Sequence, residues 1–319
     1  MAYKGLIATA RSARTPWISP LWDQVWSLAS SRLTGPVKIR LHGEDVVLNA
    51  GYAYPAFSRR WPTYNDPLVE VVHQASVAAR RPVSLVDVGA AIGDTVLLVR
   101  DRAAGDVDAF HCVEGDPEFF GYLERNLGGL SDTTLHFAML SDEPGEEAEL
   151  VRTHSGTASA QGSRRSATTT LDLLLEGTGP VDVLKSDTDG FDGKVLAGAT
   201  GILDEYQPAV IFEWHPLLYE ATGQDWHRPF EVLTAHGYRW LVWFTKEGEF
   251  SHLDNGYEPT STDALARVCL SGIGPRPDWH YDVVALPEAT AISVSDLAGL
   301  GHARSRKMSG GVGRTSPGG

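Results

Sequence analysis

Two acids and two glycines carry the clearest chemistry in this chain. Asp87 ends an apolar run, Gly89 and Gly93 follow it, and Glu114 lies about twenty residues beyond them. Glycines let a backbone turn sharply and approach a ligand closely, and an acid at that distance holds ribose hydroxyls in doubly wound nucleotide-binding folds. A dinucleotide fingerprint needs G-x-G-x-x-G, whereas this turn reads G-x-x-x-G with an acid before its first glycine. The spacing therefore favours S-adenosylmethionine over NAD.

The segments around this turn alternate between strand and helix patterns. Residues 83–88 are apolar on both faces, as a central parallel strand must be, and 94–103 has the periodicity of a helix whose N-terminus faces a ligand. Further strands are predicted at 110–114, 134–139, 181–187, 209–214, 238–244 and 281–287, with helices at 117–127, 191–206 and 230–235. The pattern predicts an α/β fold with a seven-stranded, doubly wound, Rossmann-like sheet that ends in an antiparallel pair.

A second group of polar side chains falls at the ends of the later strands. Ligands of an open α/β sheet bind outside the carboxyl ends of its strands, so we expect one crevice to collect these side chains. The crevice is predicted to contain Asp87, Glu114, Asp187, Asp189, Glu213 and His215. Asp187, Glu213 and His215 leave three interpretations open: acid and base chemistry without a metal, ligation of a divalent cation such as Mg²⁺, or structural hydrogen bonds. The absence of a short ligand motif favours the first.

The composition of the chain limits the classes of partner that it can bind. The 319 residues carry a formal net charge of −14, which disfavours nucleic acid as a partner. Cys112 and Cys269 are too few for a disulfide framework, and no segment has the length and polarity of a signal sequence or a membrane span. We expect a cytoplasmic protein without a membrane partner, and a homo-oligomer is compatible with the sequence.

The chain before the alternating pattern predicts a separate extension. A helix is expected at 20–30, two strands joined at Gly43 and Glu44, and an ordered loop covering a cleft at 52–67. Residues 143–166 are rich in Gly, Ser and Glu and predict a small excursion with a strand at 149–152.

Several motifs resemble one protein family. DVGAAIGD, VEGDP, AMLSDEPG, LKSDTDGFDGKVLAGA and AVIFEWHP follow one another, in order and spacing, as in the FkbM family of S-adenosylmethionine-dependent methyltransferases. The resemblance covers roughly 80–216 and is most specific at LKSDTDGFDGKVLAGA. The sequence departs from the family at Ala91, where Asn is common, at Ser186, where an apolar residue is usual, and at Asp192, where Glu is frequent. The departure at Ser186 predicts a looser strand end.

The resemblance implies roles for individual residues. The methionine and ribose portions of the cofactor would lie against Gly89, Ala91 and Gly93, and the adenine against Ser141 and Asp142. Lys185 and Asp187 would face the methyl donor and the acceptor.

The expected activity is methylation of a hydroxyl oxygen on a small-molecule natural product or sugar, so the substrate would be a hydroxylated or glycosylated small molecule. We predict an N-terminal helix and β extension with a lid at 1–80, the methyltransferase domain at 81–290 and a disordered tail at 291–319. The alternatives are an NAD-type oxidoreductase, disfavoured by the missing third glycine, and a non-catalytic nucleotide-binding protein.

Overall fold

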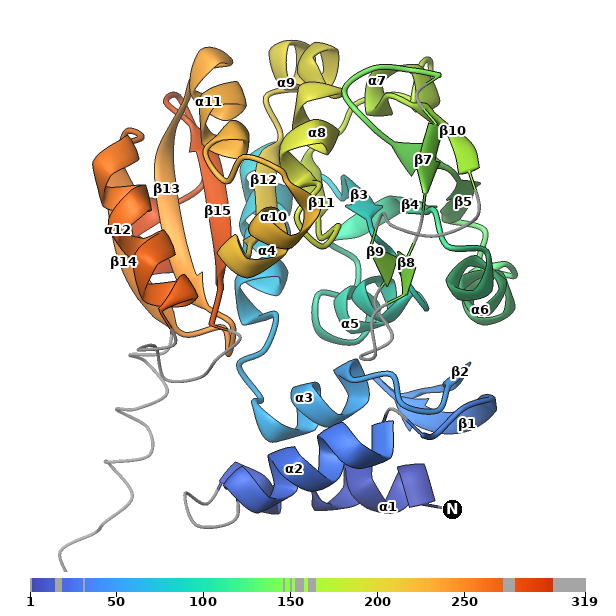
Figure 1. The fold of residues 1–319 in the computed structure, drawn as a ribbon. Coiled ribbons are helices and arrows are strands. Elements are labelled where there is room, and N and C mark those ends of the chain that lie inside the picture. The colour runs from blue at the N-terminus through green and yellow to red at the C-terminus, as the bar shows by residue number, and fades with distance from the viewer. Residues whose placement is uncertain are drawn as a thin grey trace, which may run out of the picture.

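The computed structural model describes residues 2–14, 19–30, 32–145, 147–149, 151–152, 158–159, 165–271 and 279–300. A central sheet of eight strands has helices packed on both of its faces, and a small N-terminal part lies below it (Figure 1). Along the strands, neighbouring residues alternate between the two cores: Leu85 packs in one hydrophobic cluster and Val86 in the other. This alternation confirms the doubly wound α/β fold.

The sheet reverses its strand order at its centre. Its order is β14-β13-β15-β12-β11-β3-β4-β5. The strands are β3 (Val83–Val88), β4 (Val107–Glu114), β5 (Thr133–Phe137), β11 (Val183–Ser186), β12 (Ala209–Trp214), β13 (Tyr238–Thr245), β14 (Phe250–Asn255) and β15 (Tyr281–Pro287). The neighbours from β5 to β12 are parallel, whereas β15 is antiparallel to both β12 and β13. The order changes direction between β3 and β11, and that is where doubly wound folds bind ligands.

The prediction of seven strands is wrong by one. The additional strand, β14, pairs only with β13 and forms the edge of the sheet, and its residues alternate between half-buried and exposed. Its sequence, FSHLDN, has only two apolar residues and no apolar alternation, and we had interpreted it as part of a long connection. An edge strand with one solvated face needs no apolar run.

The helices divide between the two faces. On one face lie α4 (Asp66–Ala79), α5 (Asp94–Arg102), α6 (Pro117–Leu127) and α13 (Val294–Ala298). On the other lie α7 (Leu171–Leu174), α8 (Asp192–Ala197), α9 (Thr200–Tyr206), α10 (Pro216–Thr222), α11 (Arg228–Ala235) and α12 (Pro259–Leu270). The single helix predicted at 191–206 is two helices, because the chain breaks at Gly198, where a Cβ would overlap the carbonyl oxygen of Ser141.

Short strands follow β5. A three-stranded sheet joins β6 (Met139–Leu140), β7 (Glu147–Glu149) and β10 (Arg165–Thr169), and a pair joins β8 (Val151–Arg152) and β9 (Ala158–Ser159). The predicted strand at 149–152 therefore divides into the end of β7 and β8, and residue 150 between them lies outside the described residues.

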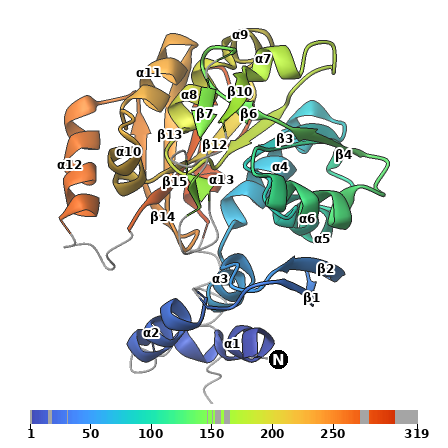
Figure 2. The same ribbon diagram turned by 45° about the vertical axis from the view of Figure 1, so that its right-hand side comes forward.

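The N-terminal part contains helices and one hairpin (Figures 1 and 2). It comprises α1 (Ala2–Thr9), η1 (Ser12–Arg14), α2 (Ser19–Ser30), β1 (Pro36–Leu41), β2 (Glu44–Asn49) and α3 (Tyr54–Arg60). The hairpin turns at His42 and Gly43, close to the predicted joint. The loop predicted at 52–67 is partly helical, because α3 occupies 54–60 and α4 begins at Asp66. Each has a proline as its second residue, Pro55 or Pro67, and proline suits the first turn of a helix.

Two predicted domain boundaries need correction. Helix α4 packs against β3, β11 and β12, so the sheet domain begins before residue 81. The predicted disordered tail is wrong for 291–300, where α13 contacts α4 and buries Leu297, while 301–319 lie outside the described residues. No helix in the described ranges is long and apolar enough to cross a membrane.

Candidate active site

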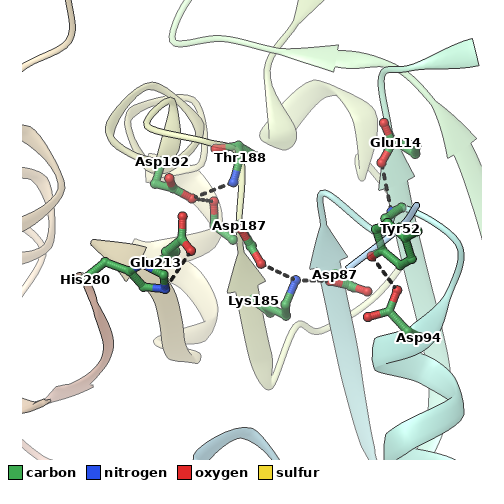
Figure 3. A network of polar contacts seen from close by, with 12 residues as sticks. Tyr52, Asp87, Asp94, Glu114, Lys185, Asp187, Thr188, Asp192, Glu213 and His280 are labelled. Carbon is green, nitrogen blue, oxygen red and sulfur yellow. Dashed lines mark hydrogen bonds and ion pairs between the residues drawn. The ribbon is translucent and has the colours of Figure 1, made fainter. Parts of the chain in front are cut away.

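A buried ion pair marks the point where the strand order reverses. Asp87 on β3 and Lys185 on β11 are register partners, and the Lys185 Nζ donates to Asp87 Oδ1 at 2.8 Å (Figure 3). Burial alone would lower the pKa of Lys185, but the carboxylates of Asp87 and Asp187 outweigh it and raise that pKa. Lys185 therefore stays protonated and holds the charge of the buried Asp87. The other carboxylate oxygen of Asp87, Oδ2, is buried with no hydrogen-bond partner among the described residues.

The glycine turn is shaped by contacts within the protein. Gly89 has φ +77°, and a Cβ there would overlap the backbone carbonyl oxygen of Asp187. Gly93 has φ +88°, and its Cβ would lie 2.5 Å from the Leu127 Cδ1. We expected the first glycine to be needed for the approach of a ligand. The structure instead gives an internal reason, since the turn after β3 packs directly on the turn after β11.

Glu114 holds the same turn from the next strand. The Oε2 of Glu114 (Figure 3) accepts the N–H of Ala91 at 2.8 Å. Its Oε1 accepts the N–H of Asp116 at 2.7 Å. Burial raises the pKa of Glu114 to about 7, although these backbone N–H groups act in the opposite direction. A carboxylate oxygen has more than one acceptor position, so Glu114 can also accept from ribose hydroxyls. Ala91 has φ +47°, in the left-handed region that Asn tolerates better, which gives a physical reason for Asn in other family members.

Sequence analysis missed Tyr52 and Asp94. Asp94 begins α5, and the Tyr52 hydroxyl donates to its Oδ1 at 3.1 Å, which joins the N-terminal part to the cofactor turn (Figure 3). Burial raises the pKa of Asp94 to about 7. A second bridge lies nearby, where the Asn126 side chain donates to the carbonyl oxygens of Val47 and Ile92. Pairs so distant in sequence leave no local signal.

On the other side of the Asp87–Lys185 pair, a small cavity collects several predicted residues. It is lined by Tyr64, Asn65, Leu68, Lys185, Ser186, Asp187, Ile211, Phe212, Glu213 and Asp282. Asp187 is 46% exposed, and its Oδ2 lies 3.9 Å from the Lys185 Nζ. Sequence analysis did not identify Asp282, which the antiparallel strand β15 places opposite Glu213. Tyr64 and Asn65 come from the segment before α4.

The acids of this cavity raise one another's pKa. Burial raises the pKa of Glu213 well above its usual value, and Asp187, Asp189 and Asp282 raise it further. Burial and Asp187 likewise raise the pKa of Asp282 to about 7. A basic side chain, His280, lies beside Glu213, with its Nε2 3.2 Å from the Glu213 Oε1 (Figure 3). The cavity is thus a site rich in carboxyl groups whose charged forms disfavour one another.

His215 is not among the residues that line the cavity. It is buried at the start of α10, where its ring stacks on His280 with a centroid distance of 4.5 Å. In the described part of the chain, no three His, Cys, Asp or Glu side chains converge as a metal site. The tentative Mg²⁺ site of Asp187, Glu213 and His215 is therefore unsupported.

Ser186 and Asp192, two residues that depart from the family pattern, are hydrogen-bonded to each other. The hydroxyl of Ser186 donates to the Asp192 Oδ1 at 2.6 Å, and the Thr188 N–H donates to the same oxygen at 3.2 Å. Both side chains are fully buried, so the looser strand end predicted from Ser186 is wrong. Asp192 fixes the 188–191 turn, in which Asp189 has φ +52°.

Ser141 and Asp142 lie against α8. The Ser141 hydroxyl donates to the Asp142 Oδ1 at 3.1 Å, and the Lys194 Nζ lies 3.4 Å from that oxygen. Although burial alone would raise the pKa of Asp142, these two neighbours lower it. Asp142 also lines a second cavity beside Gly190 and Tyr219. The proposed adenine contacts at Ser141 and Asp142 stay a prediction.

Comparison with known proteins identifies the family. Residues 87–240, which contain the Asp87–Lys185 pair, Glu114 and Glu213, match the family described as the Methyltransferase FkbM domain. The chain carries an FkbM methyltransferase domain. The match supports methyl transfer over the NAD-type alternative. No curated protein matches the chain.

Solved structures resemble it only distantly. An FkbM methyltransferase from Methylobacillus flagellatus has 15% identity, with coverage of 64% of this chain and 43% of that one and a TM-score of 0.35. This chain thus spans less than half the length of that protein. The fibrillarin pre-rRNA processing protein of Methanococcus jannaschii has 12% identity, coverage of 82% and 85%, and a TM-score of 0.40. A geranyl diphosphate methyltransferase in complex with SAM has 10% identity, coverage of 71% and 85%, and a TM-score of 0.39.

Proposed function

We propose that this FkbM protein is an S-adenosylmethionine-dependent O-methyltransferase that acts on a hydroxyl of a small-molecule natural product or sugar. The observation that carries the proposal is the division of the sheet edge at the Asp87–Lys185 pair. On one side lie the glycine turn and Glu114, and on the other lies the cavity of Asp187 and Glu213. Methyl transfer needs two such neighbouring sites, one for the donor and one for the acceptor.

The donor-side residues fit the chemistry of the cofactor. Glu114 is held by two backbone N–H groups and can accept from ribose hydroxyls, while the buried Asp87 Oδ2, without a partner among the described residues, can accept from an ammonium group. When bound, S-adenosylmethionine supplies a methyl group on a sulfonium, which leaves as a neutral thioether. Lys185, whose pKa is raised, stays protonated beside this site and pairs with Asp87.

The acceptor-side residues can receive the proton of a hydroxyl. As the new bond between methyl carbon and acceptor oxygen forms, the hydroxyl proton must leave. Asp187 is the best-placed acceptor of that proton, because it is half exposed at the cavity and lies next to the Asp87–Lys185 pair. Glu213 is the second candidate, since its raised pKa suits a general base. The metal-free interpretation is the one we favour.

Composition supports the remaining parts of the proposal. The net charge of −14 favours a partner other than nucleic acid. Cys112 and Cys269 are both buried free thiols, which is compatible with the reducing cytoplasm. A homo-oligomer remains part of the proposal.

A mass-spectrometric screen tests the activity. The protein is incubated with S-adenosylmethionine and a panel of hydroxylated natural products and methyl glycosides, with and without chelator. We expect a product heavier by one methylene unit, which the chelator does not abolish. Thermal shift with S-adenosylhomocysteine should show stabilisation that NAD does not give. Stabilisation by NAD alone contradicts the proposal. Binding of S-adenosylhomocysteine without any turnover favours the non-catalytic alternative.

A further inference from the structure

One wall of the acceptor cavity comes from outside the sheet. Residues 61–65, which we call the strap, connect α3 to α4 and place Tyr64 and Asn65 in the lining of the cavity that also contains Asp187 and Glu213. The strap lies outside the 87–240 match to the FkbM family. It therefore adds to the cavity a surface that the family region does not supply.

The strap is fixed to the far end of the sheet. The hydroxyl of Thr63 donates to the carbonyl oxygen of Glu247 at 2.6 Å, in the turn between β13 and β14. Gly248 in that turn has φ +80°, and a Cβ there would overlap the carbonyl oxygen of Thr63. Two segments almost 200 residues apart are thus in backbone contact. This contact sets the position of the next residue, Tyr64.

The ring of Tyr64 is supported by a second aromatic side chain. Tyr54 of α3 meets it edge to face, with ring centroids 5.8 Å apart, and the Tyr54 hydroxyl is in turn 2.7 Å from the His42 Nε2. Edge-to-face pairs favour one relative orientation of the two rings. The Tyr64 side chain is therefore held against the cavity from behind.

Tyr64 lines the cavity together with three carboxyl groups, those of Asp187, Glu213 and Asp282. Burial raises the pKa of Tyr64 well above the usual value, and the same three acids raise it further. The hydroxyl therefore keeps its proton at neutral pH. It is a hydrogen-bond donor in a cavity whose other polar groups are mostly acceptors, and an acceptor molecule with several oxygens needs such a donor.

We propose that Tyr64, positioned by the strap, is a specificity-determining residue that selects polyhydroxylated acceptors by donating a hydrogen bond to an oxygen next to the hydroxyl that is methylated. The inference rests on the proposed function, because it assumes that the cavity holds the acceptor. Acceptors with a single hydroxyl group cannot use this hydrogen bond. The Tyr64 hydroxyl thus separates two substrate classes and leaves donor binding unchanged.

The experiment compares two probes and two tyrosines. Methylation of methyl α-glucoside, which has several hydroxyls, and of cyclohexanol, which has one, is measured for wild type, Tyr64→Phe and Tyr238→Phe. Tyr238 is a matched control, because its buried hydroxyl donates to the carbonyl oxygen of Pro208 at the other end of the sheet. We expect Tyr64→Phe to lower kcat/KM for methyl α-glucoside by about tenfold, which corresponds to one hydrogen bond, and for cyclohexanol by less than about twofold. Tyr238→Phe should leave the ratio of the two unchanged.

A second pair of variants tests the strap. Thr63→Val and Gly248→Ala should raise KM for methyl α-glucoside, while the affinity for S-adenosylhomocysteine, measured by calorimetry, stays within about twofold of wild type. The inference is overturned if Tyr64→Phe leaves the ratio between the two probes unchanged while Asp187→Asn still abolishes turnover, a result that keeps the proposed function. If wild type methylates neither these probes nor any hydroxylated compound, both the proposed function and the inference fall.

Discussion

The proposed donor and acceptor halves of the site differ in the electrostatic surroundings of their buried acids. In the donor half, burial raises the pKa of Glu114, but the neighbours that follow in importance are backbone N–H groups that stabilise its charge. In the acceptor half, burial also raises the pKa of Glu213, but the neighbours that follow are four further carboxylates that destabilise its charge. The charge of Glu114 is thus stabilised by the protein itself, whereas the acids of the acceptor half disfavour one another's charged forms. We infer that the donor half holds one fixed ligand, whereas the pKa values of the acids in the acceptor half depend on the molecule that enters it.

The largest effect should come from the acceptor half. Asp187→Asn removes the group that receives the hydroxyl proton and leaves the glycine turn intact, because only the backbone of Asp187 contacts Gly89. Turnover should fall by roughly 100-fold or more, the usual contribution of a general base, with unchanged affinity for S-adenosylhomocysteine. Steady-state kinetics and calorimetry on the same sample measure both. Full turnover in this variant would show that another residue, such as Glu213, serves as the base.

Removing the Lys185 ammonium group should destabilise the protein where the donor and acceptor halves meet. Lys185→Met leaves the carboxylate of Asp87 buried without its cation, which should cost about 3 kcal/mol in the free energy of unfolding. The matched control is Arg81→Ala, which breaks a more exposed ion pair with Asp182 and should cost less than about 1 kcal/mol. Urea denaturation monitored by fluorescence compares the two. Equal losses of unfolding free energy in the two variants would mean that the buried pair stabilises the fold no more than the exposed pair does.

The turn after β3 contacts the turn after β11 at Gly89, and this contact gives a third comparison. Gly89 and Gly105 both have φ near +80°, but only at Gly89 does a Cβ overlap backbone, while Gly105 faces open space. We expect Gly105→Ala to cost about 1 kcal/mol from strain alone, and Gly89→Ala to cost about 2 kcal/mol more. Chemical denaturation tests this without any ligand. Similar values for the two variants would show that the turn after β3 can move away from Asp187.

The smallest effect concerns pH. Asp282 has a pKa of about 7 in the folded protein and 3.8 as its ordinary value. Between these values the folded protein retains a proton that the unfolded chain has released, so this group makes stability decrease as pH rises through that window. Asp282→Asn should therefore flatten the dependence of Tm on pH between about 4 and 7. An unchanged slope of Tm against pH would indicate that Glu213 or the acids of the donor half cause this dependence.

The donor half could be predicted from sequence because its parts are local. Strand, glycine turn and helix are continuous from Val83 to Arg102, and Glu114 ends the next strand. The resemblance to the FkbM family, confirmed by the family match, added the block around Lys185 and Asp187. The internal reason for Gly89 could not be predicted, since a pattern cannot show which backbone lies against it.

The acceptor half was only partly predictable because it is assembled over long distances. Asp187 and Glu213 follow apolar strands and were identified, but Tyr64 reaches the cavity from the N-terminal part and Asp282 from an antiparallel strand near the end of the described chain. Neither has a motif around it. His215 was expected in the crevice because it follows a strand, yet its ring stacks on His280.

The central claim is that donor binding belongs to one half and acceptor activation to the other, and calorimetry with S-adenosylhomocysteine tests it most directly. Three proteins are titrated: wild type, Glu114→Gln and Asp187→Asn, each checked for folding by its Tm. We predict that wild type and Asp187→Asn bind with equal affinity, and that Glu114→Gln binds at least about tenfold more weakly, because the amide that replaces a carboxylate oxygen opposes the N–H of Ala91 or Asp116. A wild type that does not bind S-adenosylhomocysteine, or an Asp187→Asn variant that loses affinity as strongly as Glu114→Gln, would contradict the account.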